Sequence, residues 1–386
     1  MRAEGQRGGK TVSMLYSASP PDGLSGGPVC ALDHLKVLKT GFDGTCLVLC
    51  EQTPLADRAR AADIPVWCSP FTRLGLRKGG LLRFIRGIVP VVRSRWAYVS
   101  GLRRMLKQKP GVLHVHSRAM HLPYALLAGR WARVPVVVTL HEPWTGGWEA
   151  WVQLCMIRWL AQRVVFLTEV MKRQHPRFLG KVAEVVYNHC PPAPEKTTVS
   201  AHVRPRVVMA ARMTRAKGTD VFLQACRRLK DEGLRFEAWL VGPWPRPEER
   251  AATEDYVRQN GLADVVLLRG LQEDMSSVYE QTDILLLPTR RDSFPRVVME
   301  AMCHGIPVVA TRVDGVPEMV ADGVTGMLVE PEDAQGFAAA VKRLLEDEPL
   351  RRQMGTAGRE RARKLFSPET YCARMLAIYG ELERGT

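Results

Sequence analysis

Short, continuous runs of apolar and often β-branched residues recur along the chain, separated by segments with the apolar spacing of amphipathic helices. Continuous apolar runs are typical of parallel strands covered on both faces, whereas half-exposed strands alternate apolar and polar residues. The expected strands are 11–16, 45–50, 112–116, 134–140 and 163–168 in the first half, and 206–211, 237–242, 265–270, 283–288 and 306–311 in the second. The pattern predicts an α/β protein with two doubly wound units.

The length of the chain supports a division into two domains. At 386 residues the chain exceeds what one hydrophobic core usually supports, and segment 190–205 is proline-rich and lacks periodicity. We predict a first domain over 1–195 and a second over 205–366, with a C-terminal helix of about 367–386 that packs back on the first. Because open α/β sheets bind ligands at the carboxyl ends of their strands, we expect the site in a deep cleft between the two units.

Two basic residues follow the first strand of the second half. Arg212 and Lys217 stand five apart in the segment AARMTRAKGTD, 210–220. A planar guanidinium and a mobile ammonium at the carboxyl end of a strand suit a diphosphate. The alternative is a solvated basic loop without a ligand.

Two carboxylates lie in the stretch RRDSFPRVVMEAMCHGIPVVAT, residues 290–311. A helix is expected to begin near Arg296, and its first amides favour a phosphate or a developing negative oxygen. Glu300 would lie about one turn into that helix among apolar neighbours, where a charge needs a partner. With Asp292 in the loop before it, Glu300 could accept hydrogen bonds from hydroxyls of one polyhydroxylated ligand. Otherwise Asp292 is a loop acid and Glu300 an exposed helical one.

Taken together, these motifs resemble the donor domain of retaining glycosyltransferases of family four, which have the two-domain GT-B fold with Rossmann-like domains. The family's Glu-x7-Glu pair and the run that follows it correspond to Asp292, Glu300 and residues 301–310. Its Arg-x4-Lys-Gly motif corresponds to Arg212, Lys217 and Gly218, and segments 314–318 and 322–326 fit as well. The first acid is Asp where the family usually has Glu, and Ser293 and Pro295 replace glycines around Phe294.

The resemblance implies roles for these residues in binding a nucleotide-sugar donor. Glu300 would hold the ribose hydroxyls, Asp292 would face the donor sugar, and backbone near Gly270 would hold the base. The implied donor-binding residues are Gly26, Gly27, Arg212, Lys217, Gly270, Asp292, Ser293, Phe294, Pro295, Arg296 and Glu300. The implied catalytic residues are His141, Arg212, Lys217 and Asp292.

The first half resembles the acceptor domain of the same family more loosely. Gly26 and Gly27 match a glycine-rich loop that approaches donor phosphates or acceptor, although a simple turn would also contain them. His141 matches a histidine beside the transferred sugar, whereas a lone histidine after a strand is usually structural. Trp144 and Trp148 would form an acceptor platform or belong to the core.

The resemblance also implies retention of the anomeric configuration, with the acceptor attacking the face from which the phosphate departs. No Asp-x-Asp occurs in the chain, so we expect no metal, and protein cations would neutralise the leaving diphosphate. We expect no further cofactor. UDP-sugars are the first expectation for the donor and GDP-mannose the second. The implied function is sugar transfer to a glycan or lipid-linked acceptor in cell-envelope polysaccharide, lipopolysaccharide or glycolipid biosynthesis.

The net charge of +15 is concentrated in residues 64–141, which hold fourteen Lys and Arg residues and no acid. Segment 80–109 mixes these charges with apolar residues, and we expect Pro90 to split it into two helices or a helix and a loop. Such a segment suits an anionic membrane surface. We therefore predict an anionic membrane as a partner through basic residues 73–109; an acidic glycan, or packing of the apolar side on the domain, are the alternatives.

The same residues leave three other functions open. The alternatives are a sugar-nucleotide epimerase of the same fold, a transferase acting on nucleic acid, and a non-catalytic binding relative. We expect no nucleic-acid partner, because the basic stretch has few aromatics for base stacking beyond Trp96 and Tyr98. Nine cysteines without a C-x-x-C pair indicate reduced, buried thiols. The polar start, MRAEGQRGGK, lacks the apolar core of a secretory signal. We expect a cytoplasmic protein, peripherally associated with the inner face of the cytoplasmic membrane.

Overall fold

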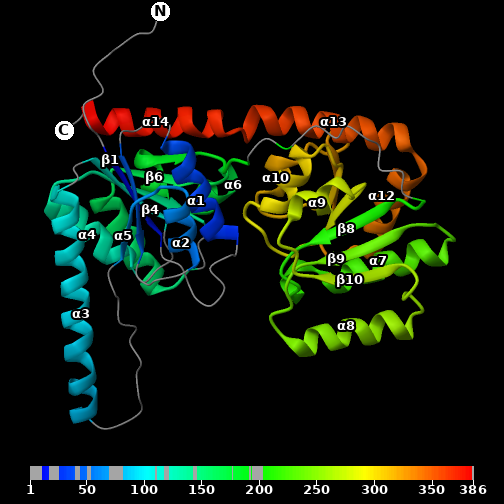
Figure 1. Ribbon diagram of the computed structural model, residues 1–386, viewed down its shortest axis with the longest axis horizontal. Coiled ribbons are helices and arrows are strands. Elements are labelled where there is room, and N and C mark those ends of the chain that lie inside the picture. Colours follow the sequence, from blue (N-terminus) through cyan, green and yellow to red (C-terminus); the bar gives the residue numbers. More distant parts are fainter. Residues whose placement is uncertain are drawn as a thin grey trace, which may run out of the picture. The chain divides into compact units, whose positions relative to one another are not determined.

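The computed structural model of the chain describes residues 11–16, 26–39, 44–49, 54–68, 81–108, 111–116, 121–141, 146–175, 177–190, 193 and 203–384. These residues fall into two compact units (Figure 1). Unit 1 comprises the described residues up to Tyr187 together with those from Tyr371 onward, and unit 2 runs from Asn188 to Thr370. The chain thus divides just before the proline-rich segment 190–205.

Unit 1 contains a seven-stranded, fully parallel sheet with the order β3-β2-β1-β4-β5-β6-β7. Its elements are β1 (Thr11–Tyr16), α1 (Gly26–Leu38), β2 (Gly44–Leu49), α2 (Pro54–Ala61), β3 (Val66–Cys68), α3 (Leu81–Gln108), β4 (Gly111–His116), α4 (Leu122–Ala132), β5 (Val136–Leu140), α5 (Trp148–Leu160), β6 (Arg163–Phe166), α6 (Glu169–Gln174), the 3-10 helix η1 (Arg177–Val182), β7 (Ala183–Val185) and most of α14 (Pro368–Arg384).

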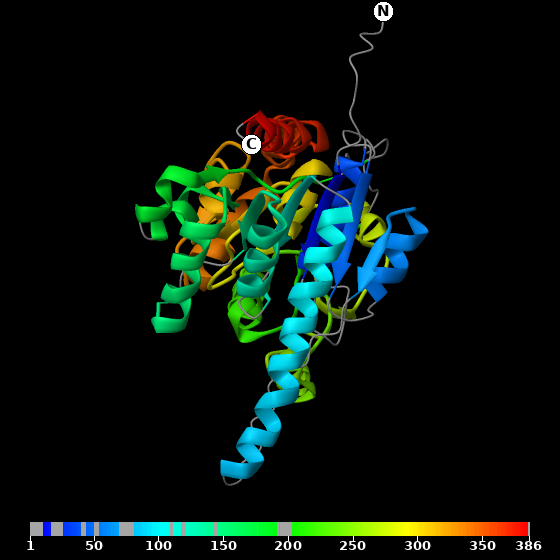
Figure 2. The same cartoon turned by 90° about the vertical axis from the view of Figure 1, so that its left-hand side faces the viewer.

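Both faces of this sheet are covered by helices, which explains why its strands are apolar throughout. Side chains of α1, α2 and α14 share one buried cluster with β1, β2, β4, β5 and β6. On the other side α3 packs on α4, and α4 packs on α5. Figure 1 labels these three helices together beside the sheet, and Figure 2 turns that side toward the viewer, with the long α3 in cyan.

Unit 2 contains a six-stranded parallel sheet with the order β10-β9-β8-β11-β12-β13. Its elements are β8 (Arg206–Ala210), the 3-10 helix η2 (Arg215–Lys217), α7 (Thr219–Asp231), β9 (Glu237–Val241), α8 (Pro247–Gln259), β10 (Val266–Gly270), α9 (Met275–Glu280), β11 (Ile284–Leu287), α10 (Arg296–Cys303), β12 (Val308–Thr311), α11 (Val316–Met319), β13 (Gly326–Val329), α12 (Ala334–Glu346) and α13 (Glu348–Leu365). In both sheets the strand order reverses beside the first strand, which is the arrangement of doubly wound, Rossmann-like folds. The predicted pair of such units is confirmed.

The predicted interruption at Pro90 is wrong. Helix α3 runs without a break from Leu81 to Gln108. A proline removes one backbone donor but holds φ near the helical value, so one missing hydrogen bond need not end a helix that is anchored elsewhere. The second half of α3 supplies that anchor, because Tyr98, Leu102 and Leu106 are fully buried.

The cysteines and the membrane-spanning potential complete the comparison with the sequence. The seven cysteines whose side chains the structure describes are free, and Cys46, Cys190 and Cys226 among them are buried. Within the described residues, no helix combines the length and apolar character that crossing a bilayer requires.

Candidate functional site

The loops that follow β8 and β11 meet at the carboxyl edge of the sheet in unit 2. Gly218 makes this approach possible: its φ is +76°, and a Cβ there would lie 1.9 Å from the Pro288 carbonyl oxygen. The Arg290 amide donates to the Ala216 carbonyl oxygen at 2.9 Å, which ties the two loops together. Because β8 and β11 are the strands beside which the order reverses, this is the edge at which ligands bind in such folds.

The side chain of Arg290 braces the same junction. Its guanidinium donates to both carboxylate oxygens of Asp220, at 2.9 and 2.8 Å, and also pairs with Glu332. Hydrogen bonds to these two carboxylates raise the pKa of Arg290 above its ordinary value. The brace joins the start of α7, the loop after β11 and the segment before α12, so the loops are held before any ligand arrives.

The charged residues predicted on these two loops are Arg212, Lys217 and Asp292. Lys217 forms an ion pair with Asp292, and both side chains are partly buried. The Asp292 amide donates to the Asp314 carboxylate at 2.9 Å, which fixes the loop that carries it. Arg212 is exposed just beyond the end of β8 and has no hydrogen-bond or ion-pair partner among the described residues. Of the two predicted cations, Arg212 is therefore unpaired and Lys217 is paired with a carboxylate.

Glu300 lies on α10 and is held by two donors. The Tyr279 hydroxyl donates to its Oε2 at 2.6 Å, and Arg296, one turn earlier on α10, pairs with its Oε1. Tyr279 is buried, and burial, with the negative charge of Glu300 next, raises the pKa of its phenol well above the ordinary value. Tyr279 therefore stays a neutral donor, and the partly buried carboxylate has the partner that its apolar setting requires.

The remaining predicted donor residues of unit 2 lie on the same edge or beneath it. Pro295 precedes α10 at its N-cap without a side-chain cap, and Ser293 is half-buried in the loop before it. Phe294 is buried with its ring 5.5 Å from that of Phe366. Gly270 ends β10 with φ +65°, and its carbonyl oxygen accepts from the Gly242 amide at 2.7 Å. Ser293, Phe294 and Pro295 thus set the entry into α10, whereas Gly270 ends β10, an outer strand of the sheet that pairs with β9.

In unit 1, His141 follows β5 and contacts a buried histidine. Its Nε2 lies 3.0 Å from Nδ1 of His116, the last residue of β4. His114, two residues earlier, lies 2.6 Å from the Tyr379 hydroxyl and 2.7 Å from Thr139 Oγ1. The ring of His141 is therefore oriented by a polar cluster that reaches α14.

The other predicted residues of unit 1 are less informative. Gly26 and Gly27 are the first two residues of α1. Trp148 is the first residue of α5 and is 75% exposed. Trp144 lies outside the described residues, as do residues 73–80 and 109 of the predicted membrane segment.

The buried histidines predict a pH dependence of stability. Burial, with nearby histidine charges, lowers the pKa of His114 to about 3 and that of His116 well below 6.5. Below about pH 6.5 the unfolded chain therefore binds protons that the folded chain does not. As the pH is lowered, the free energy of unfolding decreases by about 1.4 kcal/mol per pH unit for each such histidine. Urea denaturation of wild type and His114→Gln between about pH 7 and 4 measures this slope. In His114→Gln the free energy of unfolding should change with pH by about 1.4 kcal/mol per pH unit less than in wild type. The same pH dependence in both proteins would contradict a lowered pKa for His114.

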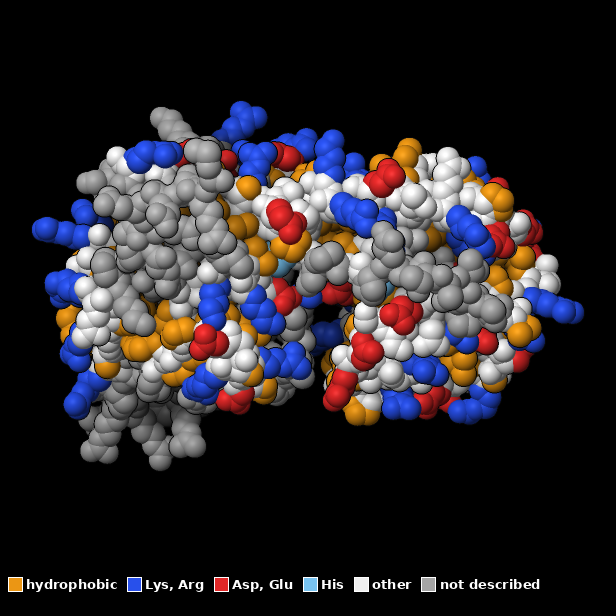
Figure 3. All heavy atoms as spheres, turned by 45° about the horizontal axis from the view of Figure 1, so that its top comes forward, with side chains coloured by type: hydrophobic (Ala, Val, Ile, Leu, Met, Phe, Trp, Pro, Cys, Tyr) orange, Lys and Arg blue, Asp and Glu red, His pale blue; other side chains and the backbone are white. Residues whose placement is uncertain are grey.

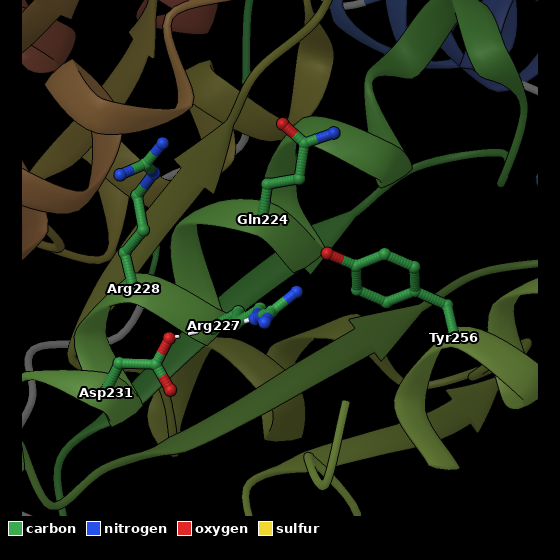
Figure 4. Close-up of a pocket in the computed structure, with 5 residues that line it drawn as sticks. All are labelled: Gln224, Arg227, Arg228, Asp231 and Tyr256. Carbon is green, nitrogen blue, oxygen red and sulfur yellow. Dashed lines mark ion pairs between the residues drawn. The ribbon is translucent and has the colours of Figure 1, made fainter. Parts of the chain in front are cut away.

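A pocket of about 440 Å³ lies elsewhere in unit 2, at α7 and α8. Figure 4 shows its lining residues, Gln224, Arg227, Arg228, Asp231 and Tyr256. Arg227 pairs with Asp231 at 3.7 Å and donates to Asn260. Because α7 begins at the carboxyl edge, its second half leads away from that edge, and the pocket contains none of the predicted site residues. We regard the carboxyl edge as the candidate site.

Four contacts around the predicted residues were missed from the sequence. Tyr279 holds Glu300, and Asp314 holds the loop that carries Asp292. Arg290 ties the two loops together, and His116 contacts His141. A signal existed for Asp314, which lies in a segment that fits the family pattern. No sequence motif marks Tyr279, Arg290 or His116, because their roles depend on tertiary contacts. Among the described residues no group of three or more His, Cys, Asp or Glu side chains could hold a metal ion.

Comparison with known proteins identifies both halves of the chain. Residues 204–347 match the model for glycosyl transferases group 1, and residues 39–191 match the model for a glycosyl transferase 4-like domain. The chain is 34% identical over 183 residues to the D-inositol 3-phosphate glycosyltransferase of Corynebacterium diphtheriae. The aligned region covers 45% of this chain and 42% of that protein. The chain is 29% identical over 272 residues to an MMP alpha-(1->4)-mannosyltransferase of Mycolicibacterium hassiacum, covering 64% of this chain and 65% of that protein.

The fold has matches among solved structures over nearly the whole chain. The structure of Anabaena HepE in complex with UDP and glucose superposes with a TM-score of 0.75 at 18% identity, over 95% of this chain and 98% of that one. At this identity the likeness establishes the fold alone. Since the two family models match consecutive parts of the chain and the units have the corresponding fold, the chain belongs to the group 1 glycosyltransferases with the GT-B fold.

Proposed function

We propose that the protein is a retaining glycosyltransferase that moves a sugar from a nucleotide-diphosphate sugar to a glycan or lipid-linked acceptor in cell-envelope polysaccharide, lipopolysaccharide or glycolipid biosynthesis. The observation that carries the proposal is the ion pair between Lys217, on the loop after β8, and Asp292, on the loop after β11. Arg212 lies on the first of these loops, and Glu300 lies on α10, which follows the second. Cations for a diphosphate and carboxylates for hydroxyls are what a nucleotide sugar requires.

Each residue of this edge has a distinct part in donor binding. Glu300, held by the neutral Tyr279 hydroxyl, accepts hydrogen bonds from the ribose hydroxyls. Arg212 and Lys217 bind the diphosphate, and Lys217 exchanges its contact with Asp292 for the phosphate. Asp292 is then released to orient the donor sugar, with the first amides of α10 adding partial positive charge near the phosphate. Phe294 and Pro295 fix the start of α10, and backbone near Gly270 meets the base.

The transfer step needs charge stabilisation more than a nucleophile. The bond between the anomeric carbon and the phosphate oxygen breaks, a bond to the acceptor oxygen forms on the same face, and the acceptor proton passes to the leaving phosphate. Arg212 and Lys217 stabilise the negative charge that grows on the diphosphate, so no metal is needed. His141 orients the sugar, which contributes through positioning.

The donor is proposed to be a UDP-sugar, with GDP-mannose as the second choice. Support for the first comes from HepE, whose structures contain UDP or UDP-glucose. The mannosyltransferase relative supports a mannosyl donor. Relatives named for colanic acid and capsular polysaccharide biosynthesis favour a glycan acceptor. We propose a cytoplasmic enzyme that meets this acceptor at the inner face of the membrane, with Trp144 and Trp148 near the acceptor.

Donor binding without a metal is the first test. We expect UDP or GDP, at about a hundred times its dissociation constant, to raise the melting temperature by about 5 °C or more, with and without EDTA. The preferred base identifies the donor class. A shift that disappears in EDTA would show that a metal, rather than Arg212 and Lys217, holds the diphosphate. No shift with any nucleoside diphosphate would contradict the proposed site.

A further inference from the structure

Five tryptophans are exposed on the helices that cover one side of the sheet in unit 1. Trp96 on α3 and Trp131 on α4 are 63% and 42% exposed, and their rings form an edge-to-face pair with centroids 5.6 Å apart. The other three lie on α5: Trp148, Trp151 and Trp159, which are 75%, 54% and 80% exposed. A soluble surface rarely collects large apolar side chains in this way unless it meets a partner.

The tryptophans of α5 form a stripe. Trp148, Trp151, Val152 and Trp159 follow the three- and four-residue spacing of one helix face, and all are exposed. Leu154 and Ile157, on the opposite face, are the side chains that α5 buries in the protein. The apolar stripe is therefore not used for packing within unit 1, since α5 already has a separate buried face.

The charges around these tryptophans are almost all positive. Arg93, Arg103, Arg104 and Lys107 are exposed on α3, and Arg130 and Arg133 are exposed at the end of α4. Residues 64–141 contain no acid, and α5 adds one, Glu149. In Figure 3 blue side chains line the left edge of the view, with orange atoms between them on the same unit.

We propose that this tryptophan face, made of the outer sides of α3, α4 and α5, docks on a lipid bilayer that contains anionic lipid. The proposal rests on the proposed function for its biological setting, because it gives the acceptor-binding unit a defined surface toward a lipid-linked acceptor. Tryptophan is enriched at membrane–water interfaces, where its ring is apolar and its N–H remains hydrated. Arginine and lysine beside it are attracted to anionic headgroups.

A second copy of the chain is a poorer occupant of the tryptophan face. A symmetric dimer through one face places the same patch on both sides of the interface. Here it would set exposed arginines and lysines of one copy against those of the other, with Glu149 as the acid available on these helices. An anionic bilayer removes this conflict, since it supplies negative charge over the apolar region and around it.

The direct experiment measures whether the tryptophans enter lipid. The full chain is sedimented with vesicles of phosphatidylcholine, with or without phosphatidylglycerol, and tryptophan quenching by brominated lipid is recorded. We expect binding and quenching with phosphatidylglycerol and weak binding without it. Trp151→Ala with Trp159→Ala should lower partitioning about tenfold or more and reduce the quenching. The matched control is Leu376→Ala, which removes an exposed apolar side chain from α14, whose buried cluster lies on the other side of the sheet, and should change nothing.

A charge variant separates the two parts of the attraction. Arg103→Gln, Arg104→Gln and Lys107→Gln together should lower binding to anionic vesicles about a hundredfold, because each cation adds attraction to the headgroups. Neutralising Arg227, Arg250 and Arg258, which are exposed on unit 2, removes the same charge and should leave binding largely unchanged.

Several outcomes would overturn the proposal. These are absence of vesicle binding by wild type, binding without quenching that survives the tryptophan variants, and a wild-type dimer that Trp151→Ala and Trp159→Ala dissolve in the absence of lipid. Release of nucleoside diphosphate from a soluble sugar nucleotide, measured in parallel, separates the two hypotheses. Vesicle binding without release of the diphosphate would support docking through the tryptophan face and contradict the proposed sugar transfer. Release without vesicle binding would support sugar transfer and contradict the docking proposal.

Discussion

Glu300→Ala should lose donor binding and, with it, sugar transfer. The carboxylate is the proposed acceptor for the ribose hydroxyls, and the Tyr279 hydroxyl at 2.6 Å holds it in place. Losing a hydrogen bond to a charged group costs about 1.5–3 kcal/mol, or about ten- to a hundredfold in affinity. We expect a cost at the upper end of this range. The substitution also removes the carboxylate that accepts from the buried Tyr279 hydroxyl and pairs with Arg296. Titration calorimetry with the preferred nucleoside diphosphate measures the loss.

Tyr279→Phe is the matched control for Glu300→Ala. It removes the hydroxyl that holds Glu300 but keeps the carboxylate and its pair with Arg296. We therefore expect a smaller loss of affinity than for Glu300→Ala, with folding of both variants checked by circular dichroism. Wild-type donor affinity in folded Glu300→Ala would remove Glu300 from the donor site.

Lys217→Ala and Arg212→Ala should depress turnover much more than donor binding. Both cations are proposed to stabilise negative charge that increases as the diphosphate leaves, so their effect should be larger in the transition state than in the bound donor. Loss of one such electrostatic group typically lowers kcat by about 10²–10³. In Lys217→Ala, Asp292 also loses its ion-pair partner, which makes the larger effect expected at this position.

Arg215→Ala is the control for the two cation variants. Arg215 lies between Arg212 and Lys217 on the same loop, is exposed, and contributes its backbone carbonyl rather than its side chain to the Arg290 contact. Its substitution removes the same charge from the loop and should leave kcat nearly unchanged. Equal losses for all three variants would indicate a general effect of loop charge rather than specific contacts with the leaving group.

The sequence predicted the sheets well because their strands are long apolar runs. The ten predicted strands are present, with ends that shift by up to two residues. Three strands were missed: β3 and β7 have three residues each, too few to show a pattern of their own, and β13 has four residues and begins at Gly326. The break predicted at Pro90 was wrong because a proline acts only locally on the helix. Burial of the second half of α3 stabilises the continuous helix despite it.

The candidate site was predictable in its chemistry and less so in its contacts. The spacing of Asp292 and Glu300 placed one carboxylate in a loop and the other on a helix, as the structure has them. Their immediate partners come from elsewhere in the fold, and Tyr279 lies on α9 with no motif to mark it. Likewise, the pairing of Lys217 with Asp292 depends on Gly218 letting two loops approach, which only the folded sheet reveals. Motifs report residue types at fixed spacing, whereas the partners follow from topology.

The most direct test of the central claim, sugar transfer from a nucleotide sugar, is release of nucleoside diphosphate from a panel of UDP- and GDP-sugars in the presence of EDTA. Wild type is expected to release the diphosphate from one donor class, faster when a membrane lipid extract supplies acceptor. At a donor concentration below its dissociation constant, Glu300→Ala is expected to release it about ten- to a hundredfold more slowly. Absence of release from every donor, with or without extract and with added Mg²⁺, would contradict the account.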